Sequence, residues 1–595
     1  MKRYRRYIKP YWKSFVFGPI LMVTEVVGEV LLPAFMANII NIGAVRHDVP
    51  YIIGMGMVML LTALVMMAGG IGGAYFSARA AISFAADLRR DVFRKVQDFS
   101  FRNIDAFSTG SLITRLTNDI TQVQNVIMMG LRLLLRAPGM LIGAVIMAFV
   151  MNPELALILL VVIPLLAAAI GCVIRIAFPR FEQMQKKIDA LNSRIQEAMV
   201  GVRIIKSFVR GSFEEEKFAR SNGELKEAGL AAFKVVILNM PIMMLAMNVT
   251  TLAVVWFGGR QVLAGTMPVG DLTAFTTYIV QVLMSLMMLA MVLLQSSRAV
   301  AGLKRITEVL DTEIDLSDEN AARKDAVVTQ GRIEFQNVSF SYYNDSRKTE
   351  TGTETEAETK KEVSARKVLS DITFTIEAGE TVGIIGATGC GKTSLVQLIP
   401  RLYDVDEGSV CVDGVDVRDY SLRHLRDGVG MVLQKNVLFS GTIAENLRWG
   451  DENADMDTIR AAAASAQAAN FVSSFPEGYE TNLSQGGVNV SGGQKQRLCI
   501  ARALIKTPKI LILDDSTSAV DTATEANIRK CFSQELKDTT KIIIAQRISS
   551  VMDADQIIVM EDGRIADMGN HAELLERCSA YREIHESQTN REVSA

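Results

Sequence analysis

Six long apolar stretches in the first half of the chain limit its fold more than any other feature of the sequence. A helix needs about 20 predominantly apolar residues to cross the hydrocarbon core of a bilayer, and each stretch is long enough. The sequence therefore predicts a helical membrane domain with six spans, at about residues 15–40, 52–76, 132–151, 154–178, 240–263 and 272–294.

The connections between these stretches alternate in length and charge. Short ones such as Asn152–Glu154 carry few basic residues, whereas the long ones, about 77–131 and 179–239, are rich in arginine and lysine. Basic connections stay on the cytosolic side of a membrane, so both termini are expected in the cytosol. The basic N-terminus, MKRYRRYIKPYWK, is followed by no small-residue cleavage site and is expected to anchor the first helix there.

The long connections have helical periodicity, as in FAADLRRDVFRKVQDF. We therefore expect the membrane helices to continue well into the cytosol, with tips near Asn103–Thr109 and Gly211–Glu216. Such extensions are either solvated helix pairs or elements that contact the second half of the chain.

Two acidic residues interrupt the first span. Glu25 and Glu29 lie one helical turn apart and share a face. Ionisable groups inside a membrane are costly and usually face the protein interior. These two could line a substrate cavity that recognises cations. Alternatively, they could be protonated, or paired with Arg132 or Arg136 of the third span.

The second half of the chain reads as an α/β domain. A charged linker, 311–330, separates the membrane domain, 1–310, from this second domain, 331–595. A polar insert at about 344–367 has few apolar residues and is expected to be mobile. The net charge of -2 gives no reason to expect a nucleic-acid partner. The six cysteines show no paired or metal-ligand spacing and fit a reducing compartment.

The second domain contains a phosphate-binding loop, GATGCGKT, between a strand-like TVGII and a helix-like SLVQLIP. Its glycines let backbone N–H groups surround the phosphates of a nucleotide, its lysine reaches the terminal phosphates, and its threonine can bind Mg²⁺. Further on, the apolar strand KILILDD ends in Asp514, which is placed to hold the same ion. The sequence therefore predicts binding of ATP and Mg²⁺ by Gly386, Ala387, Thr388, Gly389, Cys390, Gly391, Lys392, Thr393 and Asp514.

Between these two motifs stands VSGGQKQRLCIARAL, and with it the chain resembles the ATP-binding-cassette, or ABC, proteins. Gln434 looks like the Q-loop glutamine of that family, which would assist Thr393 and Asp514 at the metal. Tyr342 looks like the aromatic residue that stacks on adenine, although the adjacent Tyr343 could take that role. Asp521 looks like the D-loop aspartate. The signature itself matches Ser491, Gly492, Gly493 and Gln494.

The resemblance extends over the whole chain and implies an ABC exporter. In that family, six spans with long cytosolic extensions precede the cassette. Two cassettes enclose two ATP molecules, and each site combines the phosphate loop of one subunit with the signature of the other. Ser491–Gln494 would therefore serve a partner's site in trans.

Two positions depart from the family pattern, and both concern hydrolysis. Asp515 stands where the family has a glutamate as general base, and its side chain is about 1.5 Å shorter. Gln546 stands where the family has a histidine that contacts the γ-phosphate, and glutamine cannot relay a proton. The signature, in contrast, is intact. This combination resembles the degenerate-site subunit of heterodimeric exporters, many of which export multiple drugs.

The sequence therefore predicts a subunit of an ATP-driven exporter of drug-like or amphipathic compounds in a bacterial inner membrane. Its partner would be a second half-transporter with an intact catalytic glutamate and histidine. Two alternatives remain open: a homodimer in which Asp515 acts as a slow base, and an ABC-type gated channel. A non-transporting ABC ATPase is disfavoured by the six fused spans.

Overall fold

The computed structural model describes residues 4–319, 321–342 and 367–593, with side chains for all of these except 239, 290–299 and 589–593. The chain divides into two compact units. The first comprises Met1–Gln97 and Thr109–Thr312, and the second comprises Asp98–Ser108 and Glu313–Ala595. Except for its last residue, the polar insert predicted at about 344–367 lies outside the described residues.

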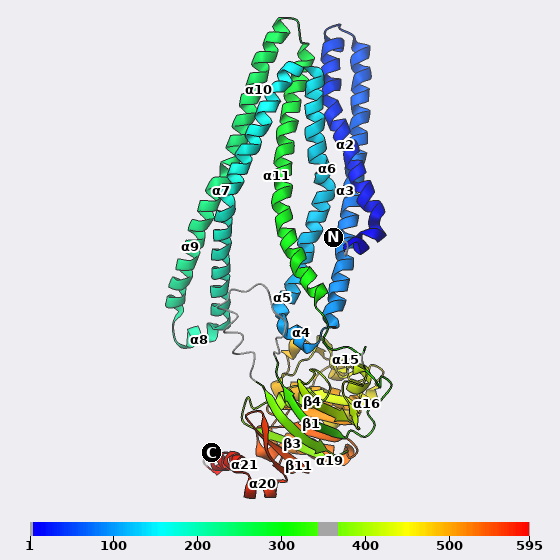
Figure 1. Ribbon diagram of the computed structural model, residues 1–595, viewed down its shortest axis with the longest axis vertical. Coiled ribbons are helices and arrows are strands. Elements are labelled where there is room, and N and C mark those ends of the chain that lie inside the picture. The colour runs from blue at the N-terminus through cyan, green and yellow to red at the C-terminus, as the bar shows by residue number, and fades with distance from the viewer. Residues whose placement is uncertain (1–3, 320, 343–366, 594–595) are drawn as a thin grey trace. The chain divides into compact units, whose positions relative to one another are not determined.

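The first unit is built of helices in its described part (Figure 1). They are α1 (Arg5–Ile8), η2 (Lys9–Tyr11), α2 (Trp12–Asn38), η3 (Ile39–Ala44), α3 (Val49–Gln97), α5 (Thr109–Thr114), η4 (Arg115–Asp119), α6 (Ile120–Met151), α7 (Pro153–Val200), α8 (Val202–Ser207), α9 (Gly211–Ile237), α10 (Asn239–Leu263) and α11 (Val269–Asp311).

Six helical segments are long and apolar enough to span a membrane, which confirms the predicted number. Several are much longer than a bilayer requires. The 49 residues of α3 rise by about 73 Å at 1.5 Å per residue, against a hydrocarbon thickness of about 30 Å. The predicted continuation of the helices is thus confirmed for α3 and α7. The tip predicted near Gly211–Glu216 lies earlier in the chain, around α8, because α9 already begins at Gly211.

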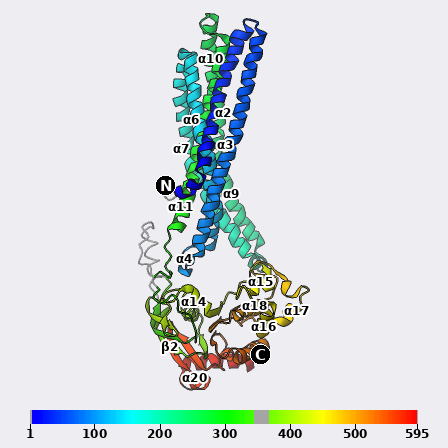
Figure 2. The same cartoon turned by 90° about the vertical axis from the view of Figure 1, so that its right-hand side faces the viewer.

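Small residues bring α2 and α3 close together, and the two helices run side by side in both views (Figures 1 and 2). A methyl group on Gly69 would lie 2.4 Å from the hydroxyl oxygen of Thr24, and one on Gly73 would lie 2.6 Å from Met22. The contact at Gly69 is the more restrictive one, because the backbone carbonyl oxygen of Leu21 would also lie only 3.0 Å from the methyl group, whereas the atom near Gly73 is the flexible end of Met22. Close backbone approach through glycine is a common way to pack helices in a membrane.

The second unit contains a six-stranded sheet, ordered β12-β11-β3-β10-β9-β6, and a four-stranded antiparallel sheet, ordered β2-β1-β4-β5. All neighbouring pairs in the larger sheet are parallel except β11 and β12. The strands are β1 (Ile333–Phe340), β2 (Leu369–Ile376), β3 (Thr381–Gly386), β4 (Glu407–Val412), β5 (Val415–Asp416), β6 (Val429–Val432), β7 (Gly441–Thr442), β8 (Asn482–Leu483), β9 (Ile510–Asp514), β10 (Thr540–Ile544), β11 (Gln556–Glu561) and β12 (Arg564–Gly569).

Helices that precede, connect or follow these strands complete the α/β domain. They are α4 (Phe101–Ala106), α13 (Lys392–Gln397), α14 (Leu422–Asp427), α15 (Ile443–Leu447), α16 (Met456–Ser465), α17 (Ala469–Ser473), η5 (Gly478–Glu480), η6 (Gln485–Gly487), α18 (Gly492–Ile505), α19 (Thr522–Glu535), η7 (Ile548–Ser550), α20 (His571–Arg577) and α21 (Ser579–Val593).

The helix α4 belongs to the second unit although it is distant in sequence from the rest of that unit. The hydroxyl of Tyr403 donates a hydrogen bond to Asp105 Oδ2 at 2.7 Å. The centroids of the Tyr403 and Phe101 rings are also 6.0 Å apart. The chain returns to the first unit at Thr109, three residues after α4 ends at Ala106.

Strand register fixes which residues meet at the carboxyl edge of the larger sheet. Asp514 pairs with Ile544, and Ile544 pairs with Ile384 on the other side. The ends of β9, β10 and β3 are therefore level with one another. This edge is where parallel α/β sheets place their ligands.

Candidate functional site

The loop Gly386–Thr393 joins β3 to α13, and its glycines are required by backbone geometry. Gly386, Gly389 and Gly391 have φ values of 154°, 87° and 98°. These lie in the region that side chains other than glycine rarely adopt. At Gly386 a methyl group would also lie 2.2 Å from the carbonyl oxygen of Met560. The loop can therefore turn tightly and leave its N–H groups free of side-chain cover.

The ammonium group of Lys392 lies over this loop. Its Nζ donates to the carbonyl oxygens of Gly386 at 2.9 Å and Ala387 at 2.8 Å. Carbonyls are weaker partners for an ammonium than phosphate oxygens. This geometry is compatible with the predicted role of Lys392, in which the loop contacts would be exchanged for the terminal phosphates of a nucleotide.

The oxygen atoms of Thr393 and Asp514 fit a magnesium ion. The Thr393 hydroxyl donates to Asp514 Oδ1 at 3.1 Å. Asp514 is 1% exposed, and its Oδ2 has no partner among the described residues. Burial raises the pKa of Asp514, partly offset by the Thr393 hydrogen bond. A bound Mg²⁺ would supply the missing partner, since this ion prefers hydroxyl and carboxylate oxygens.

Replacing Asp514 by asparagine should stabilise the nucleotide-free protein. Because the pKa of Asp514 is raised above its ordinary value of 3.8, the charged carboxylate opposes folding at neutral pH. We expect the melting temperature of the Asp514→Asn variant to rise by about 2–4 °C for each ~1 kcal/mol that the substitution adds to the free energy of unfolding. The gain should shrink as the pH falls towards 3.8, and stabilisation by Mg·ATP should be lost. An equal gain at all pH values would contradict this account.

A cavity of about 310 Å³ brings together ten of the twenty predicted site residues. Residues of the phosphate loop, the predicted metal ligands Thr393 and Asp514, and the two residues that differ from the family pattern, Asp515 and Gln546, all line this cavity. It is lined by Tyr342, Val368, Thr388, Gly389, Gly391, Lys392, Thr393, Ser394, Gln434, Asp514, Asp515, Ile544 and Gln546.

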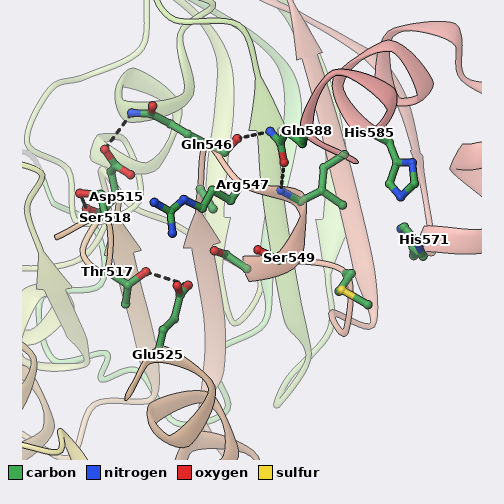
Figure 3. Close-up of a pocket in the computed structure, with 14 residues that line it drawn as sticks. Asp515, Thr517, Ser518, Glu525, Gln546, Arg547, Ser549, His571, His585 and Gln588 are labelled. Carbon is green, nitrogen blue, oxygen red and sulfur yellow. Dashed lines mark hydrogen bonds between the residues drawn. The ribbon is translucent and has the colours of Figure 1, made fainter. Parts of the chain in front are cut away.

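The two departing residues contact each other. Gln546 Nε2 donates to Asp515 Oδ2 at 2.9 Å (Figure 3). Burial raises the pKa of Asp515, and hydrogen bonds from Gln434 and Gln546 partly counter that effect. Asp515 also has a φ of 49°, a left-handed conformation that aspartate tolerates better than most residues.

Tyr342 lies in the wall of the cavity but is engaged with the protein itself. Its hydroxyl is 2.8 Å from Ser394 Oγ, and its ring packs edge-on against Tyr403 with centroids 5.2 Å apart. The alternative adenine partner, Tyr343, lies outside the described residues.

The signature and the D-loop aspartate do not join this cavity: none of Ser491–Gln494 or Asp521 is among its described lining residues. Ser491 instead caps α18, where its Oγ accepts from Gln494 N at 3.3 Å and its N–H donates to Gln494 Oε1 at 2.9 Å. Asp521 likewise caps α19. Ser491 and Gly492 are exposed. The start of α18 thus presents N–H groups to the outside of the domain.

In the membrane unit, Glu25 and Glu29 are paired with an arginine, one of the alternatives that the sequence left open. Arg136 Nη1 is 3.0 Å from Glu25 Oε1, and Arg136 Nη2 is 3.2 Å from Glu29 Oε2. The other arginine considered, Arg132, is exposed. Two carboxylates therefore share one guanidinium. Glu25 Oε2 is buried without a partner among the described residues.

Comparison with known proteins finds two family models that match separate parts of the chain. Residues 15–286 match the ABC transporter transmembrane region, and residues 369–518 match the ABC transporter domain. An uncharacterized ABC transporter ATP-binding protein of Bacillus subtilis is 40% identical over 594 residues, which cover 100% of both chains. An ATP-dependent lipid A-core flippase of Syntrophus aciditrophicus is 33% identical over 84% of this chain and 80% of its own.

The fold is similar to that of a solved structure, a bacterial Atm1-family ABC exporter with ATP bound. The TM-score is 0.77 at 26% identity, with 97% of this chain and 98% of the other covered.

Proposed function

The chain belongs to the ABC transporter family, as a multi-pass cell-membrane exporter with a cytosolic ATP-binding cassette, and on this premise we propose that it is the subunit with the impaired site in a heterodimeric exporter. It binds Mg·ATP in the cavity at Gly386–Thr393 and hydrolyses it poorly. Its signature completes the competent site of a partner subunit. The cargo is a drug-like or amphipathic compound moved outward.

The contact between Gln546 and Asp515 is the observation that carries this proposal. A general base must accept a proton from the attacking water. The carboxylate of Asp515 already accepts a hydrogen bond from Gln546 at 2.9 Å. Gln546 in turn is a neutral amide that can neither take up nor release a proton. The pair therefore suits holding a nucleotide better than cleaving it.

The position of the signature supports a role for a second cassette. Ser491 and Gly492 are exposed, and the cavity of the same chain is lined by other residues in its described part. An ABC half-transporter acts as a dimer, so this exposed helix start is available to the nucleotide of a partner. Because Ser491–Gln494 match the family and Asp515 and Gln546 do not, the two sites of the dimer would be unequal.

Asp515→Glu alone should restore little hydrolysis at this site. Gln546 remains, and glutamate tolerates the φ of 49° less well than aspartate. We expect single-site turnover to stay well below the gain of about 10²–10⁴-fold that a working general base provides. Pairing the change with Gln546→His should give a clearly larger rate. If Asp515→Glu alone reached that rate, the length of the carboxylate would be the only defect.

ATP turnover by the chain purified alone tests the heterodimer directly. We expect slow hydrolysis alone and a large increase when the partner subunit is present. Robust turnover by the chain alone would favour the homodimer, with Asp515 as a slow base. Ion flux through the reconstituted complex would instead favour a gated channel.

The cargo is proposed from the charges of the membrane unit. Glu25 and Glu29 share the single positive charge of Arg136, so this cluster has a net charge of about -1 when all three groups are ionised. If this cluster faces the transport pathway, its negative charge would favour cationic amphipathic compounds. A transport screen with the paired complex should find that Glu25→Gln selectively reduces export of cations. An equal effect on neutral compounds would assign Glu25 to helix packing.

A further inference from the structure

The C-terminal helix α21 holds the loop that carries Gln546. The side-chain amide of Gln588 makes two hydrogen bonds to the backbone of this loop (Figure 3). Its Nε2 donates to the carbonyl oxygen of Gln546 at 2.8 Å, and its Oε1 accepts from the N–H of Ile548 at 2.9 Å. One side chain thus fixes the loop on both sides of Arg547.

The place of Gln588 follows from how α21 is anchored. Tyr581 is 0% exposed and packs in a cluster with Ile548 and Leu574, and its hydroxyl lies 2.7 Å from His571 Nδ1. Gln588 is seven residues after Tyr581, about two helical turns, and so lies on the same face of α21. Burial of Tyr581 therefore directs Gln588 towards the loop.

The loop has open space on this side. It lines a cavity of about 560 Å³ that also includes Asp515, Thr517 and Gln588 (Figure 3). Side chains bordering such a space are not held by close packing. Hydrogen bonds to the backbone therefore matter more here for the position of Gln546 than they would in a filled core.

We propose that Gln588 is a positioning residue of the nucleotide site. It fixes the backbone of Gln546, which sets the hydrogen bond from Gln546 to Asp515, and this pair in turn favours ATP over ADP. The inference rests on the proposed function, in which Mg·ATP binds in the cavity that Gln546 and Asp515 help to line.

The test compares Mg·ATP and Mg·ADP binding by the purified full-length chain. For Gln588→Ala we expect about five- to tenfold weaker ATP binding, the size expected for loss of these hydrogen bonds, with ADP binding unchanged. Gln588→Glu keeps the acceptor for Ile548 but places an oxygen against the carbonyl of Gln546, so it should behave like the alanine variant. Glu586→Ala, an exposed change on the same helix, serves as the matched control.

A double variant separates positioning from simple stabilisation. If Gln588 acts through Gln546, then Gln588→Ala should have no further effect on ATP binding in a Gln546→Ala background. Additive effects, or equal losses for ATP and ADP, would overturn the inference. If Gln546→Ala reduces the preference for ATP but Gln588→Ala does not, the inference fails and the proposed function stands. A wild-type chain that binds Mg·ATP and Mg·ADP equally would also overturn the inference, whereas one that binds no Mg·ATP would overturn the proposed function itself.

Discussion

Lys392→Ala is expected to weaken ATP binding to this chain by about 100-fold, or ~3 kcal/mol. Lys392 is the cation that lies over the phosphate loop, and its bonds to Gly386 and Ala387 would be exchanged for charge-assisted bonds to phosphate. Equilibrium binding of Mg·ATP to the purified chain measures the loss. Lys435→Ala, which removes an exposed lysine outside this cavity, is the matched control.

The same variant has a second expected outcome in the assembled complex. If this chain supplies the impaired site, Lys392→Ala should leave much of the ATP turnover of the complex intact. In a homodimer the same substitution would disable every site. Near-complete loss of turnover in a complex whose partner is unaltered would therefore contradict the proposed division of labour.

Gly492→Asp should have the opposite pattern: normal ATP binding by this chain but a loss of about 100-fold in turnover by the complex. Gly492 is exposed in the first turn of α18, and an added Cβ would meet only an ordinary contact of 3.5 Å with Ala519. A carboxylate in the first turn of a helix does not oppose folding, because it complements the helix dipole. It would, however, repel the phosphates of a nucleotide bound by the partner.

The control for this prediction adds the same charge to a helix start elsewhere. Thr458 is exposed in the first turn of α16, so Thr458→Asp should leave turnover unchanged. Full activity of the Gly492→Asp complex would show that the signature of this chain does not act in trans. Ser491→Ala is a poorer probe, because removal of this cap costs about 1 kcal/mol of helix stability in its own right.

Local sequence patterns were sufficient to predict the membrane helices and the main residues of the nucleotide site. The apolar stretches predict the membrane helices because a bilayer sets their length and composition. The phosphate loop is predictable because its local backbone conformation requires glycine, as the positive φ values of Gly386 and Gly391 show. Asp514 was predictable as well, since it ends a buried strand.

Contacts between distant segments could not be predicted in the same way. Gln546 meets Asp515 because β9 and β10 pair in a particular register, which no local pattern encodes. The choice of Arg136 over Arg132 depends on how α6 faces α2. Gln588 carries no motif at all, because a single glutamine in a polar C-terminal helix looks like a solvent-exposed residue.

The hydrogen bond between Tyr403 and Asp105 has a consequence for how the protein is made. The two residues are 298 positions apart in the chain. At about 5–20 residues per second, α4 leaves the ribosome about 15–60 s before its binding surface exists. During that interval α4 has no cassette to bind. The contact of α4 with the cassette must therefore wait until the residues around Tyr403 have been synthesised, although α4 itself is made between two membrane-spanning helices in the sequence.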